Sequence, residues 1–146
     1  MAKGNETGLR LSYTIFCDDV RLEVGNKLSL MGVFHQILVQ HFPVTVMKFA
    51  VVNQWRGEGR HLSEVRILSE ERQQAVVLAE PAPFEVAAGG VANNISFFFN
   101  VEFPAPGLYR VQTLIDSSLA DEQELALVHV GPNSLPAPDA SSDAVN

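Results

Sequence analysis

The sequence has a single cysteine, Cys17, so no disulfide can form within the chain and a reducing compartment is allowed. It has no apolar run approaching the ~18 residues that a membrane helix requires. The first six residues are polar and lack the apolar segment of a signal peptide. These absences predict a soluble, cytoplasmic protein that needs no disulfide to fold.

Basic residues are also scarce, since ten Lys and Arg stand against seventeen Asp and Glu, and the formal net charge is −7. The basic residues are scattered along the chain, so no positive patch offsets the repulsion from nucleic acid. We therefore expect neither a nucleic-acid partner nor a membrane partner.

The composition fits one globular domain with a sizeable core, because 47% of the 146 residues are hydrophobic and 18% are charged. Residues 1–8 are small and polar, and residues 131–146 are rich in Pro, Ser and Asp. Such segments cannot bury enough apolar surface to order themselves. We expect two disordered tails around a folded domain at residues 9–130.

A sustained helical period is missing, and apolar residues recur at every second position. One such run ends at Ile15 and Cys17, after which the phase flips so that Val20 and Leu22 are apolar. A flip at Asp18 and Asp19 predicts a bulge, a corner or a break, because a regular strand would turn its apolar face to water. A single helical turn with Asp18 as its N-cap is the competing interpretation.

The clearest strand follows Asn94 and alternates Ile95, Phe97, Phe99, Val101 and Phe103 with more polar residues. This phase predicts Phe97 and Phe99 in the core and Phe98 on the opposite face. Phe16 is also out of phase with its neighbours. Phe98 and Phe16 are therefore candidates for a contact between subunits.

About eight short segments of this kind, separated by Gly, Pro and Asn, predict an all-β fold. We favour a two-sheet antiparallel sandwich of immunoglobulin-like type over a barrel. The turn at 104–107 followed by Tyr109 favours the sandwich, in which a corner tyrosine hydrogen-bonds to backbone upstream of it.

Residues 16–34 read Phe-Cys-Asp-Asp-Val-Arg-Leu-Glu-Val-Gly-Asn-Lys-Leu-Ser-Leu-Met-Gly-Val-Phe. This motif resembles the opening of a family of short bacterial proteins of unknown function, and Gly107-Leu108-Tyr109 resembles the strand near the end of its members. The resemblance covers most of the predicted domain. It implies a bacterial, cytoplasmic β-sandwich and no particular activity.

The segment from Trp55 to His61 is the first candidate site. It is predicted as a loop with two glycines, on which Trp55, Arg56, Arg60 and His61 would hold a carboxylate, a sugar or a partner's acidic segment. The alternative is that Trp55 closes one end of the core and the arginines are merely solvated.

The second candidate is the turn motif Asp18, Asp19, Arg21 and Glu23. Clustered carboxylates suit a hard cation, but the spacing of a calcium loop is missing and Arg21 lies among the acids. We favour a structural turn in which Glu23 pairs with Lys27. Cys17 is predicted as a small buried residue rather than a nucleophile. The histidines match no zinc spacing, so we expect no metal and no cofactor.

These features predict a non-catalytic protein-binding or assembly module that recruits a protein partner, or a second copy of itself, through an edge strand. The alternative function is small-ligand binding, of a sugar or an anion, by residues 55–61. A hydrolase that uses Asp18, Asp19 and a histidine is the remote alternative.

Overall fold

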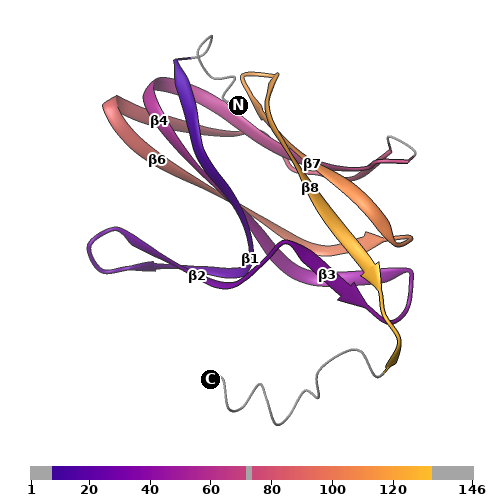
Figure 1. Cartoon of the computed structure of the whole chain (residues 1–146). Coiled ribbons are helices and arrows are strands. Elements are labelled where there is room, and N and C mark those ends of the chain that lie inside the picture. The colour runs from indigo at the N-terminus through magenta and orange to yellow at the C-terminus, as the bar shows by residue number, and fades with distance from the viewer. Residues whose placement is uncertain (1–7, 72–73, 133–146) are drawn as a thin grey trace.

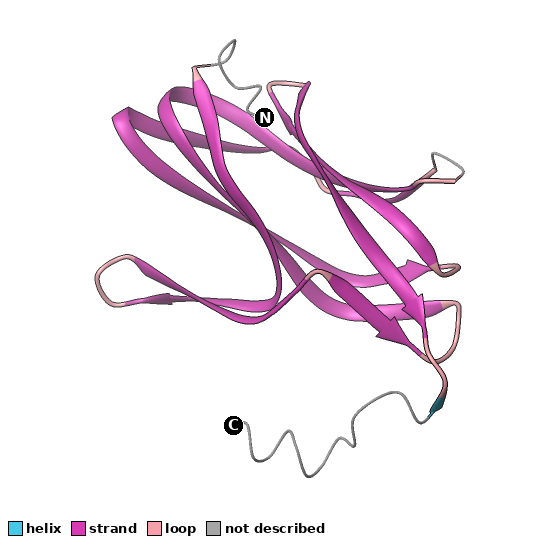
Figure 2. Ribbon diagram, in the orientation of Figure 1, coloured by secondary structure: helices cyan, strands magenta, loops and turns pink. Residues whose placement is uncertain are grey.

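The computed structural model describes residues 8–71 and 74–132, and it confirms the all-β prediction (Figures 1 and 2). No α-helix is present in these ranges, and so no helix among them has the length and hydropathy to cross a bilayer. The predicted tails, 1–8 and 131–146, lie almost entirely outside the described residues. The strands are β1 (Leu9–Glu23), β2 (Lys27–Phe34), β3 (Gln36–Val39), β4 (Val44–Ser69), β5 (Ala75–Leu78), β6 (Ala82–Phe103), β7 (Gly107–Ile115) and β8 (Ser118–His129).

All eight strands share one hydrogen-bonded sheet with the order β2-β1-β4-β7-β8-β3, and β5 and β6 also pair with β4. The pairing of β3 with β8 is parallel, and the other pairs are antiparallel. The all-β part of the prediction is therefore confirmed, but the structure has one continuous sheet in place of two separate antiparallel sheets. Two separate sheets do not form because β4 is long enough to run through both halves of the molecule.

β4 joins the two halves by changing partners along its length. Its first half pairs with β1, and its second half, from Ser63, pairs with β7. The change follows a shift in the β4–β6 register between Gly57 and Gly59, where both glycines have positive φ. The bend at this irregularity folds the sheet over on itself (Figure 1).

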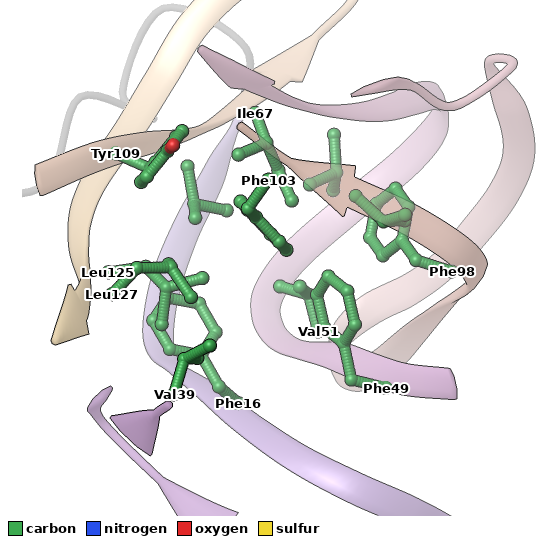
Figure 3. Close-up of a cluster of buried hydrophobic side chains, with 13 residues drawn as sticks. Phe16, Val39, Phe49, Val51, Ile67, Phe98, Phe103, Tyr109, Leu125 and Leu127 are labelled. Carbon is green, nitrogen blue, oxygen red and sulfur yellow. The ribbon is translucent and has the colours of Figure 1, made fainter. Parts of the chain in front are cut away.

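The main core lies between the two folded halves of the sheet. Side chains from six strands meet there, and Phe49 stacks on Phe98 with ring centroids 5.2 Å apart (Figure 3). The fully or nearly buried members are Phe16, Val39, Phe49, Val51, Val65, Ile67, Phe98, Val101, Phe103, Tyr109, Val111, Leu125 and Leu127.

The predicted orientation of the three consecutive phenylalanines is wrong. Phe98 is buried, while Phe97 and Phe99 are 40% and 61% exposed. Val101 and Phe103 do point inward, but Asn100 adopts a left-handed conformation with φ of 55°. That residue interrupts the pleat, so the strand before it presents the opposite set of side chains to the core.

The phase flip at Asp18 coincides with the point where β1 leaves β4 and continues in its pairing with β2. β1 continues through Asp18 as one strand in unbroken register with β2, so the helical turn and the bulge are both wrong. Its ribbon bends sharply on the way into the β1–β2 hairpin, which agrees with the predicted corner (Figure 1). Gly32, on the facing strand β2, has φ of 68°. A Cβ at Gly32 would overlap the carboxylate of Asp18, so only glycine fits beside that side chain.

Candidate functional site

An open groove of about 920 Å³ lies between the β4–β5 hairpin and the end of β6 with the turn that follows it. Both walls come from ends of strands that are far apart in sequence. The apolar part of the lining is formed by Val76, Val77, Phe99, Val101, Leu108 and Tyr109.

Tyr109 fixes the wall formed by the β6–β7 turn. Its hydroxyl donates a 2.6 Å hydrogen bond to the carbonyl oxygen of Ala105, and the Ala105 amide lies 3.4 Å from the same hydroxyl. The ring packs edge-on against Phe103 at 5.0 Å between centroids. The predicted role of Tyr109 as a corner tyrosine is confirmed, and the consequence is a fixed groove wall.

Arg110 fixes the opposite wall. Its guanidinium lies 3.1 Å from Glu70, in the turn of the β4–β5 hairpin, and 3.3 Å from Glu122 on β8. The hydrogen bond to Glu70 is the main cause that raises the pKa of Arg110. The amide of Glu70 also donates to the carbonyl of Leu108 at 3.2 Å. These contacts hold the hairpin at a set distance from β7.

The groove is acidic and borders an open strand edge. Three glutamates, Glu70, Glu71 and Glu102, line it, and no Lys, Arg or His is among its described lining residues. β5 pairs with β4 alone within the described part of the chain, so its other edge offers backbone donors and acceptors. The site can therefore take an extended, apolar and cationic segment.

The segment from Trp55 to His61 is not the predicted loop, because β4 runs through it without a break. Trp55 is fully buried and stacks with Phe84 at 6.4 Å between centroids, which agrees with the alternative that it closes one end of the core. Successive strand residues point to opposite faces, so the exposed Arg56 does not share a site with Trp55. Arg60 is exposed and lies 3.7 Å from Glu85.

His61 is held in a shallow pocket by contacts to both ring nitrogens. Nδ1 lies 2.8 Å from Oδ2 of Asp116, and Nε2 lies 3.0 Å from the carbonyl oxygen of Glu58. Burial alone would lower the pKa of His61, but the hydrogen bonds to Asp116 and Glu58 outweigh it and raise the pKa. The hydrogen bond with His61 correspondingly lowers the pKa of Asp116.

Both partners of His61 are acceptors, so both contacts are hydrogen bonds only when the ring is protonated. Oδ1 of Asp116 also accepts the amide of Leu62 at 2.9 Å. The pair therefore fastens the β7–β8 turn to β4, and neither ring nitrogen is available for other chemistry in this arrangement.

The acidic turn motif is a set of structural contacts along the β1–β2 hairpin. Asp19 pairs with Lys48 at 2.9 Å, and this hydrogen bond is the main cause that lowers the pKa of Asp19. Burial, followed by the charge of Asp19, raises the pKa of Asp18.

Glu23 lies opposite Lys27 in the hairpin, as predicted, but its carboxylate accepts a hydrogen bond from Ser29 at 2.8 Å. Arg21 is exposed beside Asp19.

Cys17 is fully buried against Ala50 and Val52, as the sequence predicts. Burial is the main cause that raises the pKa of its thiol, which opposes a nucleophilic role. Within residues 8–71 and 74–132, no three His, Cys, Asp or Glu side chains gather in a way that would hold a metal ion.

The fold defines a small all-β domain organised around one long bent strand, with a groove at the open end of its sheet. Residues 12–128 match the model of a family of unknown function, DUF6941, and the chain belongs to this family. The match confirms the resemblance to a family of unknown function. No curated protein matches the sequence.

Solved structures with a similar fold are larger proteins. One is the alkylpurine DNA glycosylase AlkC of Pseudomonas fluorescens bound to DNA containing an abasic site analog, with a TM-score of 0.55 and 9% identity over 83% of this chain and 30% of that one. Another is a β-glucosidase from Listeria innocua in complex with glucose, with a TM-score of 0.51 and 12% identity over 84% of this chain and 16% of that one. This chain thus spans less than a third of either protein, and the likeness concerns the fold.

The groove was not predicted from the sequence. Its lining comes from residues 69–71, 74–77, 99–102 and 104–109, none of which carries a binding motif. The one local signal was the turn at 104–107 with Tyr109, which pointed to a corner rather than to a site.

Proposed function

We propose that this domain is a non-catalytic protein-binding module that takes up an extended segment of a partner in the groove beside β5. The observation that carries the proposal is the groove itself, with its apolar floor, its acidic rim and the open edge of β5. A segment that adds as a strand satisfies backbone groups at that edge and directs alternate side chains to the floor. We also propose that the domain is related to the immunoglobulin-like sandwiches, with the two halves of its one folded sheet as the two layers. A bacterial origin and a cytoplasmic location are part of the same proposal.

The charge of the groove selects the partner. Glu71 and Glu102 favour Lys or Arg in the bound segment. Residues 131–146 of this chain contain two Asp and no Lys or Arg, so they are a poor electrostatic match for the groove. Similar folds that make up 30% and 16% of larger proteins support the idea that this architecture serves as one module among others.

Calorimetry with two short extended peptides tests the proposal, one alternating Val with Lys and the other alternating Val with Glu. We expect the Val-Lys peptide to bind and the Val-Glu peptide not to bind. Leu108→Asp, on the groove wall, should weaken binding at least about tenfold. Leu22→Asp, at an exposed leucine on the β1–β2 hairpin, is the matched control and should bind as the wild type does. Equal binding of both peptides, or an unchanged Leu108→Asp variant, would refute the proposal.

The alternative function, binding of a small anion, is favoured by one specific observation. Arg10 and Arg56 lie directly opposite each other on β1 and β4, and they line a pocket of about 410 Å³ with Gly57, Gly89 and Gly90. Two like charges placed opposite each other in a sheet repel unless an anion lies between them. Inorganic phosphate should then raise the melting temperature of the wild type and not that of Arg10→Gln.

A further inference from the structure

The long strand β6 leaves one edge open. β6 pairs with β4 alone within the described residues, so its second edge is free from one end to the other. Between Glu85 and Glu102 the strand contains no charged residue and no proline. Lysines, inward charges, prolines and β-bulges are the features by which monomeric proteins keep such edges from pairing. β6 is irregular at residues 87–89, opposite the register shift of β4, and at the left-handed Asn100, so the regular stretch without any of these features is residues 91–99.

The outer face of the sheet next to this edge is apolar. The strand register places Cys17, Ala50 and Phe97 in one row across β1, β4 and β6, and Ile15, Val52 and Ile95 in the next. Each row ends at the free edge in a partly exposed side chain. Phe97 and Phe99 stack there with centroids 6.2 Å apart, at 40% and 61% exposure.

The charge nearest to this patch is already paired. The ammonium group of Lys48 lies 5.1 Å from the centroid of Phe97 and 2.9 Å from the carboxylate of Asp19. The patch and the edge therefore form a surface without net charge on a chain whose net charge is −7.

We propose that a second copy of this chain binds at this edge, with the two β6 strands antiparallel about a twofold axis perpendicular to the sheet. Any register with the axis between residues 95 and 99 places Ile95, Phe97 and Phe99 of both copies on one face. The dimer joins two sheets into one, with the two β6 strands at its centre, and buries both aromatic patches.

Charge is the reason that the occupant is a second copy. A partner recruited for its opposite charge requires charged groups on this edge, as the groove beside β5 provides, and the edge has none. Two acidic chains repel each other over most of their surfaces, but here they approach without bringing carboxylates together. An isologous contact also requires a self-complementary patch, and an uncharged strand edge flanked by aromatic side chains meets that requirement.

Sedimentation velocity on the full chain over a wide concentration range tests this inference. The wild type should sediment as a species of twice the 16.0 kDa chain mass. Phe97→Lys should raise the dissociation constant of the dimer at least about tenfold. Leu22→Lys, which makes the same change at an exposed leucine on the β1–β2 hairpin, should leave the dimer intact. Phe99 lies at the border of this surface and also lines the peptide groove. Leu108→Asp, at a groove residue on β7 and away from the β6 edge, should leave the dimer intact as well, so the two proposals fail independently.

Hydrogen exchange provides a readout that does not depend on a variant. Amides of residues 91–99 at the free edge should become protected as the protein concentration rises. Any of three results would overturn the inference. The wild type could be monomeric throughout the concentration range, or Phe97→Lys could remain dimeric while retaining the wild-type circular dichroism. The third result is concentration-dependent protection on a strand other than β6.

Discussion

The hydroxyl of Tyr109 donates a 2.6 Å hydrogen bond to the carbonyl of Ala105, four residues earlier in the chain. This bond ties the first residues of β7 to the turn that ends β6. The next residue, Arg110, ties the same strand to Glu70 on the β4–β5 hairpin. Two consecutive residues of β7 thus set the positions of both walls of the groove.

Tyr109→Phe should lower the free energy of unfolding by about 1 kcal/mol, because it deletes one partly buried hydrogen bond and keeps the ring. It should also weaken binding of the Val-Lys peptide, since the turn is no longer held in place. Urea denaturation and calorimetry measure the two effects. A variant that loses stability but binds with unchanged affinity would show that the corner does not position the groove.

Asp116→Asn should destabilise the domain by about 1 kcal/mol in the pH range where His61 is protonated. Asparagine tolerates the positive φ of 51° at this position, so the substitution mainly removes charge. The pKa of His61 is raised above its ordinary 6.5, so its contribution is complete below that pH and is lost as the pH rises through the folded value. The pKa of Asp116 is lowered below 3.8, so its contribution is lost only as the pH falls through the lower folded value.

The difference in melting temperature between the wild type and Asp116→Asn should therefore be largest between about pH 4 and 6.5 and should shrink in alkaline solution. Thermal unfolding across this pH range measures it. A constant difference at every pH would contradict the linkage of His61 to Asp116.

Gly32→Ala should lower the free energy of unfolding by about 2 kcal/mol more than Gly89→Ala does. Both glycines have nearly the same φ, 68° and 69°, so the strain of a left-handed alanine is matched. Only at Gly32 does the new Cβ meet another side chain, the carboxylate of Asp18, whereas nothing lies within 4 Å at Gly89. In an Asp18→Ala background most of the difference should disappear, because only the close contact with the Cβ of residue 18 at 3.0 Å remains. Chemical denaturation of the single and double variants measures the change.

Phe98→Ala should destabilise the domain by about 3 kcal/mol, because it empties a site in the main core. Phe97→Ala should cost less than about 1 kcal/mol when measured on dilute, monomeric protein, because that ring is partly exposed. Urea denaturation of the pair tests the orientation of the strand directly. If Phe97→Ala destabilised the domain more than Phe98→Ala, Phe97 and not Phe98 would lie in the core, as alternation alone predicts.

Cys17 should react with a thiol reagent about a thousandfold more slowly in the native protein than in urea. The side chain is fully buried, and burial together with the charges of Asp18 and Asp19 raises the pKa of its thiol. Stopped-flow labelling with a chromogenic disulfide measures both rates. Fast labelling under native conditions would show that β1 opens locally at this position.

The sequence by itself determined the class of the fold, the corner in β1 at Asp18, the buried position of Cys17 and the role of Tyr109. These follow from local properties, namely two-residue alternation, its interruption and turn chemistry, which a chain carries wherever its segments later pack. The resemblance to a family of unknown function is likewise a property of the sequence alone.

Only the tertiary structure decided which phenylalanine of the 97–99 run enters the core. Alternation predicts which side chains point inward only within an unbroken strand, and the left-handed residue Asn100 exchanges the inward and outward sets of side chains. It also decided that Trp55 belongs to the core while Arg56 faces outward, since β4 continues, with a bend, through a segment rich in loop-forming residues. The groove and the open edge of β6 depend on which strands pair. Pairing is set by contacts between residues distant in sequence, and no local pattern records them.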